Sequence, residues 1–320
     1  MKVLIVFGTR PEAIKMAPLV HELENRDGFE LKVCVTAQHR EILDKVLDLF
    51  NIKPDYDLNI MKHNQTLQSV VVDMLPKLTE VMQSYKPNMV LVHGDTATTA
   101  ITSLAAFYLK IPIGHVEAGL RTYDIYSPWP EEGNRRITGV LSTLHFTPTE
   151  DTKKNLLQEN VHDKNIVVTG NIVIDALFSV RKKLNNPKLK SEMELAFPYL
   201  QNSRPMVLIT VHRRENHGKP LETIIAAIKN LATKYTDIIF VLPMHPNPNV
   251  KAPLTANLED WNNIHLIEPQ EYVPFVYLMT RSTFILSDSG GIQEEAPALG
   301  KPVLVLRNTT ERPEAVKAGT

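Results

Sequence analysis

The chain has 320 residues, and single hydrophobic cores seldom keep growing beyond about 250–300 residues, so two domains are expected. Lysine and arginine number 35 and aspartate and glutamate 36, which gives a formal net charge of −1. This balance excludes an overall electrostatic field that favours nucleic acid or an anionic membrane surface, so a bound anion must be met by a local cluster of cations.

The chain has one cysteine, Cys34, inside the apolar run 32–35. A single thiol excludes an intrachain disulfide and a metal site built from several thiolates, and we expect a packed core thiol. The apolar run 3–7 is too short for a signal peptide, and no run of about eighteen apolar residues could span a bilayer. A cytoplasmic protein is therefore expected.

Short runs of apolar, β-branched residues predict the strands. In the first half they lie at 3–7, 32–36, 88–92, 112–116 and 165–168, and each is followed by a longer segment with helical spacing. A charged, less periodic stretch follows residue 170, and the pattern then restarts with strands at 206–211, 238–242, 264–267, 283–287 and 302–306. The alternation predicts an α/β fold with two doubly wound, Rossmann-like domains, residues 1–170 and 171–320. Such domains are expected to face each other across a cleft, with the ligand beyond the carboxyl ends of the strands.

The segment 288–295 follows a predicted strand and opens a helix with Ser289, Gly290 and Gly291. Small residues let backbone N–H groups approach a ligand, and a helix N-terminus carries about half a positive charge, so the segment predicts a diphosphate site. The alternative is an ordinary serine cap with glycines in a turn. Glu295 suits the paired hydroxyls of a ribose, and its alternative is a helix-surface acid. Three cations could bind the same anion: Arg10, Lys15 and Arg312. The alternative for each of them is a solvated surface charge.

Three acids and one histidine follow or border predicted strands. Asp95, Glu117 and Glu131 lie in the first half, and His212 comes at the end of the strand 206–211. Paired carboxylates can divide acid and base roles when their environments separate their pKa values. A structural role is the alternative for each of them, but acids that flank glycines at strand exits favour the catalytic interpretation.

Two kinds of cofactor are not expected. No G-x-G-x-x-G follows the first strand and no Tyr-x-x-x-Lys pair occurs, which argues against a bound nicotinamide. The 11 histidines show no close ligand pair with a third acid, so a catalytic metal is not indicated either. The sequence predicts proton transfer without a cofactor.

Several longer stretches match a known family. They include F-G-T-R-P-E-A-I-K-M-A-P from Phe7, H-G-D-T from His93, G-H-V-E-A-G-L-R-T from Gly114, Y-S-P-W-P-E-E from Tyr126, H-R-R-E-N from His212, E-P-Q-E-Y from Glu268 and S-D-S-G-G-I-Q-E-E-A-P-A-L-G-K-P-V-L-V-L-R from Ser287. In these stretches the sequence closely resembles the non-hydrolysing UDP-N-acetylglucosamine 2-epimerases of bacteria, and the resemblance covers essentially the whole chain.

The resemblance implies a GT-B-like architecture with catalytic acids in the N-terminal domain and UDP bound by the C-terminal domain. It implies interconversion of UDP-GlcNAc and UDP-ManNAc, a precursor for bacterial surface polysaccharide, by a homodimer that needs no cofactor. The implied mechanism is anti elimination of UDP to a bound 2-acetamidoglucal and its re-addition, with the proton delivered to the opposite face. With Glu131 as a further catalytic acid, ligand contacts carry over to Arg10, Lys15, Asp95, Glu117, His212, Gln270, the Phe275 backbone, Ser289, Gly290, Gly291, Glu295 and Arg312.

Relatives that a second UDP-GlcNAc activates have an allosteric pocket, and parts of it are present here. Gln38, His39 and His245 match the residues of that pocket. Glu41 and Asn64 stand where those relatives have glutamine and arginine. These differences argue against strict dependence on an activator.

Other departures from the family pattern lie beside the catalytic loops and at the end of the chain. Ala97 stands where family members usually have threonine, and Gly133 stands where they usually have alanine or a larger residue. The chain ends at Thr320 where relatives continue, so a truncated C-terminal domain is expected. The alternatives to a non-hydrolysing epimerase are a hydrolysing 2-epimerase, a glycosyltransferase of the same fold and an inactive UDP-sugar-binding module.

Overall fold

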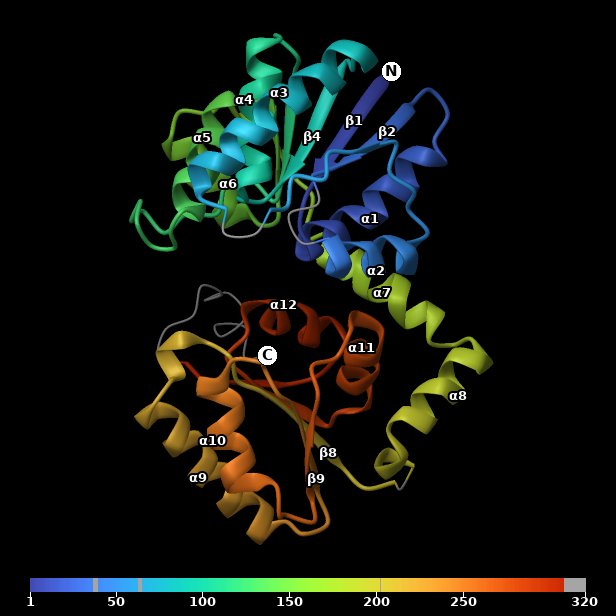
Figure 1. Cartoon of the computed structure of the whole chain (residues 1–320), viewed down its shortest axis with the longest axis vertical. Helices are drawn as coiled ribbons and strands as arrows, with labels where there is room; N and C mark the ends of the chain where they lie inside the picture. Colours follow the sequence, from blue (N-terminus) through green and yellow to red (C-terminus); the bar gives the residue numbers. More distant parts are fainter. Residues whose placement is uncertain (37–39, 63–64, 202, 308–320) are drawn as a thin grey trace. The chain divides into compact units, whose positions relative to one another are not determined.

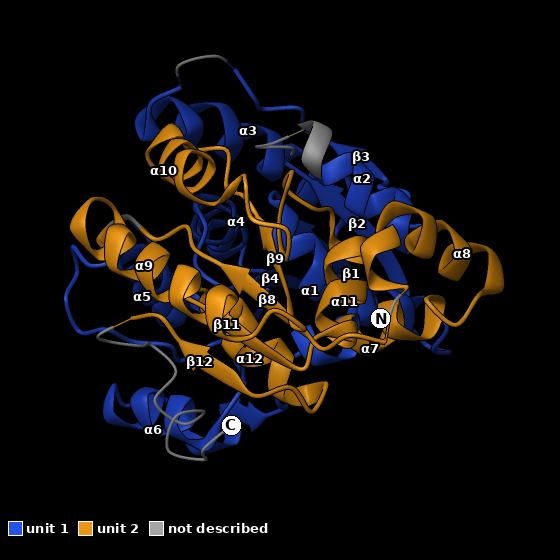
Figure 2. Ribbon diagram, turned by 90° about the horizontal axis from the view of Figure 1, so that it is seen from below, with its two compact units in different colours: residues 1–176 blue, residues 177–320 orange. Residues whose placement is uncertain are grey.

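The computed structural model describes residues 1–36, 40–62, 65–201 and 203–307 (Figure 1). It divides into two compact units, Met1–Ala176 and Leu177–Thr320, and the boundary falls within helix α7 (Val173–Lys183) (Figure 2). Each unit is an α/β fold built on one parallel sheet, so the predicted fold class is confirmed. Among the described residues, no helix combines the length and the apolar content that crossing a membrane requires.

The sheet of the first unit has the strand order β3-β2-β1-β4-β5-β6-β7. Its strands are β1 (Lys2–Phe7), β2 (Glu30–Val35), β3 (Tyr56–Asp57), β4 (Met89–His93), β5 (Ile113–Val116), β6 (Leu144–Thr147) and β7 (Ile166–Val168). All except β3 and β6 were predicted. The sequence analysis missed β3 because it has only two residues, and β6 because Leu-His-Phe-Thr contains no apolar, β-branched run.

Helices cover both faces of this sheet. They are α1 (Arg10–Glu24), α2 (Arg40–Phe50), α3 (Leu67–Tyr85), α4 (Ala97–Tyr108), α5 (Glu131–Leu141) and α6 (Glu150–Gln158), and a 3₁₀ turn, η1 (Asp163–Asn165), precedes β7. Leu4 and Val6 of β1 pack with α3 and α4 in one core cluster. The alternate residues Ile5 and Phe7 point to the opposite face, which α1 contacts. Cys34 is buried in the first cluster and burial raises its pKa to about 12, so the packed core thiol is confirmed.

The second unit repeats this plan with the strand order β10-β9-β8-β11-β12. Its strands, all five of them predicted, are β8 (Met206–Thr210), β9 (Ile239–Pro243), β10 (Ile264–Ile267), β11 (Phe284–Ser287) and β12 (Val303–Val305). Its helices are α8 (Pro187–Ala196), α9 (Lys219–Lys234), α10 (Pro248–Leu258), α11 (Tyr272–Arg281) and α12 (Gly290–Ala298), with 3₁₀ turns η2 (Pro198–Leu200) and η3 (Arg214–Asn216). The main core cluster packs α9 and α10 against one face of the sheet.

In each sheet the strand order reverses next to the first strand of the unit. The reversal lies between β1 and β4 in the first unit and between β8 and β11 in the second. Loops that leave the carboxyl ends of strands on either side of such a point diverge, and ligands of open α/β sheets bind there. The loops after β1 and β4, and those after β8 and β11, therefore lie where a site is expected.

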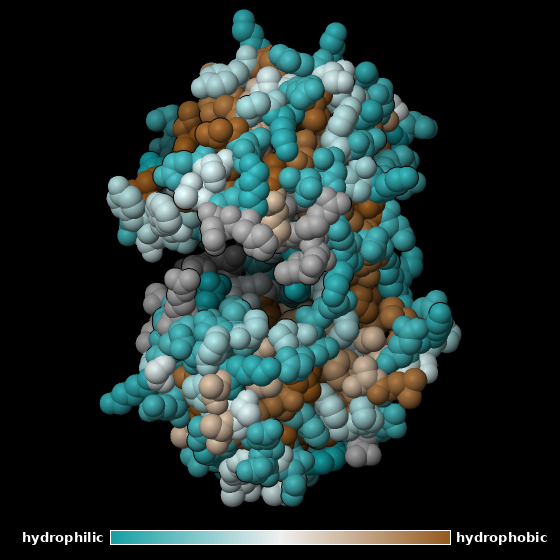
Figure 3. Space-filling model, in the orientation of Figure 1, coloured by the Kyte–Doolittle hydropathy of each residue, from teal (hydrophilic) through white to brown (hydrophobic). Residues whose placement is uncertain are grey.

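Apolar side chains also reach the surface of the first unit, on neighbouring helices. Val72 of α3, Phe107 and Tyr108 of α4 and Val140 of α5 are all exposed. Helix α4 contacts both α3 and α5. Figure 3 shows apolar residues gathered over these helices.

Candidate active site

The loops after β1 and β4 are joined by a buried carboxylate, Glu12. It accepts hydrogen bonds from the backbone N–H groups of Gly8 (3.0 Å) and Thr9 (2.8 Å), and from the hydroxyl of Thr96 (2.7 Å) in the loop after β4. Burial raises the pKa of Glu12, and these donors oppose that rise. The sequence analysis did not select Glu12, although Thr9-x-x-Glu12 is a capping-box pattern that could have identified it.

Glu117 follows β5 in a strained backbone conformation. Its φ of 62° lies in the left-handed region, which residues other than glycine rarely adopt. Such strained conformations recur at functional sites. The ammonium group of Lys15 donates a hydrogen bond to Glu117 Oε1, and Nε2 of His93 lies 3.6 Å from Oε2. Burial lowers the pKa of His93 to about 4, so at neutral pH this ring is uncharged and the contact is not an ion pair. Lys15 is therefore part of a polar cluster and not a solvated surface charge.

Asp95, after β4, pairs with an arginine that the sequence analysis did not select. Nη2 and Nε of Arg135, on α5, lie 2.5 and 3.1 Å from Asp95 Oδ2, and Nη1 lies 3.2 Å from Oε2 of the fully buried Glu132. Burial raises the pKa of Asp95, the charges of Glu117 and Glu131 add to that rise, and Arg135 opposes it.

Glu131 is the first residue of α5 and belongs to the same group. Its Oε2 is buried, and among the described residues it has no hydrogen-bond partner. An acid in the first turn of a helix is favoured by the helix dipole. We call Lys15, Asp95, Glu117, Glu131 and Arg135 the acid cluster. It brings together all three acids that the sequence analysis selected.

In the second unit, His212 after β8 meets Asp288 after β11. Oδ2 of Asp288 accepts hydrogen bonds from the backbone N–H groups of His212 and Arg213, both 2.9 Å, and from Nδ2 of Asn216 at 2.8 Å. Nδ1 of His212 lies 3.0 Å from Oδ1. Burial alone would raise the pKa of Asp288, but the hydrogen bonds from His212 and Arg213 lower it to about 2. The ring of His245 stacks on that of His212, with 5.9 Å between centroids.

The segment predicted to bind a diphosphate forms the N-terminus of α12. Ser289 occupies the N-cap position, but its side chain makes no capping hydrogen bond, so the ordinary serine cap is not what the structure contains. Gly290 and Gly291 begin the helix, and a Cβ on Gly291 would meet no closer atom than Ser289 Oγ at 3.8 Å. Glu295 is buried and accepts a hydrogen bond from the hydroxyl of Tyr272 at 2.6 Å, so it is not a helix-surface acid.

The remaining predicted residues are less informative. Arg10 begins α1, Nε2 of Gln270 donates to the carbonyl of Glu268, and the backbone N–H of Phe275, in the first turn of α11, donates to the carbonyl of Glu271, the N-cap residue of that helix. No group of three His, Cys, Asp or Glu side chains that could hold a metal ion occurs in the part of the chain that the structure describes. The predictions for four residues fall outside that part: Gln38, His39, Asn64 and Arg312.

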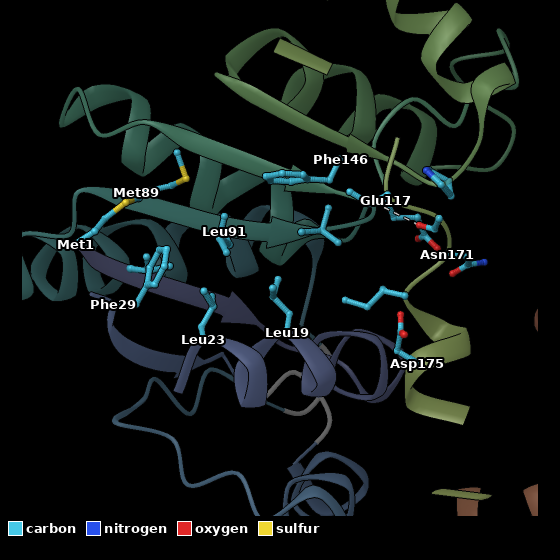
Figure 4. A pocket seen from close by; sticks show the side chains of 16 residues that line it. Met1, Leu19, Leu23, Phe29, Met89, Leu91, Glu117, Phe146, Asn171 and Asp175 are labelled. Atoms are coloured by element: carbon cyan, nitrogen blue, oxygen red, sulfur yellow. Dashed lines mark hydrogen bonds between the residues drawn. The ribbon is translucent and has the colours of Figure 1, made fainter. Parts of the chain in front are cut away.

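A cavity of about 370 Å³ lies beside the acid cluster in the first unit (Figure 4). Glu117, Asn171 and Asp175 are at one end, and the rest of the lining is mainly apolar, including Phe29 and Phe146. An apolar lining does not suit a charged nucleotide sugar, because it leaves the phosphates without donors. We therefore place the candidate functional residues of each unit at its own polar cluster and not in this cavity.

Comparisons with known proteins identify the family of the chain. A model of the UDP-N-acetylglucosamine 2-epimerase family matches residues 21–320. The UDP-N-acetylglucosamine 2-epimerase of Neisseria meningitidis serogroup A is 62% identical over 320 residues, which is 100% of this chain and 86% of the relative. That of Escherichia coli K12 is 59% identical over 321 residues, covering 100% of this chain and 85% of the relative.

Solved structures give the same result. The crystal structure of UDP-GlcNAc 2-epimerase from Neisseria meningitidis bound to UDP-GlcNAc has a TM-score of 0.91 and 62% identity, covering 99% of this chain and 86% of that one. The UDP-GlcNAc 2-epimerase of Methanocaldococcus jannaschii has a TM-score of 0.88 at 35% identity, covering 100% and 87%. This chain belongs to the UDP-N-acetylglucosamine 2-epimerase family.

Proposed function

We propose that the protein interconverts UDP-GlcNAc and UDP-ManNAc without net hydrolysis, by elimination and re-addition of UDP. A base takes the proton from carbon 2, the electrons of that C–H bond form a double bond to carbon 1, and the bond from carbon 1 to UDP breaks. UDP then adds back to carbon 1 while a proton is delivered to the opposite face of carbon 2. The product is a nucleotide sugar of the kind used for bacterial surface polysaccharide.

The acid cluster is the observation that carries this proposal. Asp95 and Glu117 follow neighbouring strands, and each lies beside a different cation, Arg135 and Lys15. Carboxylates in different environments can hold different protonation states at one pH, which a reaction with one acid and one base requires. Glu131, whose Oε2 makes no hydrogen bond with the described residues, is the third group available for proton transfer.

We assign the UDP leaving group to the second unit. The first turn of α12, with Ser289, Gly290 and Gly291, offers backbone N–H groups and a helix dipole to the diphosphate. Glu295 is placed four residues further on the same helix and is assigned to the ribose hydroxyls. His212 lies in the loop after β8 and contacts Asp288 in the loop that precedes α12. We assign His212 to the reacting end of the ligand. Arg312 remains a predicted diphosphate contact.

Turnover in deuterium oxide tests the chemistry. Proton exchange at carbon 2 predicts a product labelled there with deuterium, visible by NMR, because the original proton is lost to an exchangeable group. Glu117→Gln and Asp95→Asn keep size and hydrogen bonding but remove the titrating proton, so each is expected to lower the rate by about 10²–10⁴-fold. Glu22→Gln, which changes an exposed acid on α1, is the matched control and should leave the rate unchanged.

Three results would contradict the proposal. Unlabelled product would exclude proton exchange at carbon 2. Near wild-type turnover in both acid variants would remove them from the chemistry. Free UDP that accumulates in proportion to converted sugar would indicate a hydrolysing epimerase.

We also propose that the protein is a homodimer, with the exposed apolar side chains of α3, α4 and α5 as the contact surface. Val140 is 84% exposed and Val72 is 70% exposed. Exposed apolar side chains that gather on adjacent elements favour association because packing removes them from water (Figure 3). Light scattering should give twice the chain mass of 36.1 kDa, and Val140→Glu should lower it to one chain. A monomeric wild-type protein would contradict the proposal.

A further inference from the structure

Asp288, in the loop after β11, has no assigned role, yet its carboxylate is fully enclosed beside the loop that carries His212. The residue is 0% exposed. Its Oδ2 is the common acceptor for the backbone N–H groups of His212 and Arg213 and for the amide of Asn216. Its Oδ1 is buried, has no hydrogen bond with the described residues, and lies 3.0 Å from His212 Nδ1.

We propose that Asp288 is a positioning residue that fixes the tautomer of His212: its Oδ1 accepts a hydrogen bond from Nδ1–H, so that Nε2 is the ring atom presented to the substrate. The inference rests on the proposed function, in which His212 meets the reacting end of the ligand. Asp288 itself touches no substrate in this scheme. It acts through the imidazole.

The chemistry of the two groups supports this assignment. A neutral imidazole carries its proton on only one of its two nitrogens. A hydrogen-bond acceptor beside one nitrogen holds the proton on that nitrogen. An ionised carboxylate can only accept, so an oxygen 3.0 Å from Nδ1 requires a proton on that nitrogen. A small rotation of the ring aligns the N–H with Oδ1, which has no competing partner among the described residues. Nε2 then has a free lone pair.

Two further contacts limit how His212 can turn. The backbone N–H of the same residue donates to Asp288 Oδ2, so one carboxylate holds both the main chain and the ring. His245 stacks on the imidazole with an interplanar angle of 21°. The ring is therefore held from its Nδ1 edge and from one face, which leaves the Nε2 edge as the one available to a ligand.

Asp288→Asn is the decisive variant. The asparagine oxygen can keep the three N–H donors that Oδ2 now accepts. Its NH₂ group then points at Nδ1, which must become an acceptor, so the ring proton moves to Nε2. Nitrogen-15 NMR of histidine-labelled full chain reports the tautomer directly, and the His212 signals are those lost in His212→Gln. We expect Nδ1–H in the wild type and Nε2–H in Asp288→Asn.

The kinetic readout separates this role from a purely structural one. Loss of the correct tautomer should lower kcat by about 10²–10⁴-fold, as for other losses of acid–base function, with KM for UDP-GlcNAc changed only a few-fold. Asn216→Ala is the matched control, because it removes one donor from Oδ2 but leaves the contact between Oδ1 and His212. It should keep the Nδ1–H tautomer and most of kcat.

Several outcomes overturn the inference. They are an Nε2–H tautomer in the wild type, an unchanged tautomer in Asp288→Asn, a switched tautomer with unchanged kcat, or an equal loss of kcat in Asn216→Ala. A wild-type protein that does not convert UDP-GlcNAc would instead refute the proposed function, and the tautomer measurement would still decide whether Asp288 fixes the ring.

Discussion

Asp95, which is half-buried, and Asp288, which is fully buried, lie at the ends of central strands, one in each unit, but their pKa values move in opposite directions. Burial alone would raise both. Asp95 has one cationic partner, Arg135, and two nearby acids, Glu117 and Glu131, and its pKa stays raised. Asp288 accepts three N–H hydrogen bonds at one oxygen, faces a histidine at the other, and has its pKa lowered to about 2. The groups that surround a buried carboxylate therefore decide whether it keeps its charge.

Glu12 shows that hydrogen bonds alone do not always lower the pKa of a buried carboxylate. It accepts hydrogen bonds from two backbone N–H groups and from threonine hydroxyls, yet its pKa is raised. Complete burial outweighs these donors, which include no charged group. Asp95 and Glu12 can thus change protonation more readily than Asp288. Only Asp95 belongs to the acid cluster, so it is suited to proton transfer, whereas Asp288 is suited to hold a neighbour in place.

The largest expected effect is on stability and comes from removing the carboxylate of Glu12. In Glu12→Ala the N–H groups of Gly8 and Thr9 and the hydroxyl of Thr96 lose a buried acceptor. An unsatisfied buried donor costs about 1–3 kcal/mol, so the free energy of unfolding should fall by about 3 kcal/mol or more. Urea unfolding followed by circular dichroism measures the loss. Glu12→Gln keeps an acceptor oxygen and should lose less than half as much; equal losses would show that the charge, and not the acceptors, matters.

The acid cluster should respond most to Arg135→Gln. The cation lowers the pKa of Asp95, so its removal raises that pKa further, and whichever limb of the pH–rate profile Asp95 governs moves to higher pH. Loss of a charged hydrogen bond of about 1.5–3 kcal/mol corresponds to a shift of about one to two pH units. A profile of kcat/KM against pH measures it.

Arg135→Lys is the matched control for this shift. It keeps the positive charge but loses the planar fork that contacts both Asp95 and Glu132, so its shift should be smaller. An acid or alkaline limb that moves to lower pH in Arg135→Gln would contradict the pairing of Arg135 with Asp95.

These predictions depend on residues that the sequence revealed to different degrees. The strands and the sheet class could be predicted, because runs such as Met206–Thr210 are apolar, β-branched and flanked by polar loops. The rule that ligands bind at strand exits also located Lys15, Asp95 and Glu117. It did so without knowing which of them touch.

The partners of these residues could not be predicted. Arg135 lies 40 positions after Asp95, and Asp288 lies 76 positions after His212, so no local spacing connects them. Asp288 stands inside a recognised motif, but a motif does not say which of its members is buried. The left-handed backbone of Glu117 was equally hidden, because that conformation is usual for glycine and not for glutamate.

Asp288 should make acid stability of the second unit depend on its charge. Its pKa in the folded chain lies below the usual value, so the ionised form stabilises the fold above about pH 4, and this contribution is lost as pH falls toward 2. Lowering from 3.8 to about 2 corresponds to on the order of 2 kcal/mol at neutral pH. Fluorescence of Trp261, which packs against the core of this unit, reports its unfolding. The stability difference between wild type and Asp288→Asn should shrink by about half at pH 3; a difference that does not vary with pH would contradict the assignment.

The smallest effect is expected at Gly133, in the helix that carries Glu131 and Arg135. A Cβ added there would lie 3.8 Å from Ile125 Cδ1, an ordinary contact, and its φ is not in the left-handed region. Glycine inside a helix is less favourable than alanine by about 0.5–1 kcal/mol, so Gly133→Ala should raise the free energy of unfolding by that amount. Gly119→Ala is the opposite case, because its φ is 87° and its Cβ would lie 2.2 Å from the carbonyl oxygen of Thr152. Gly119→Ala should therefore lower the free energy of unfolding. If Gly133→Ala lowers it too, α5 is not the regular helix on which the geometry of the acid cluster depends. If Gly133→Ala raises it and leaves kcat unchanged, the acid cluster tolerates a stiffer α5.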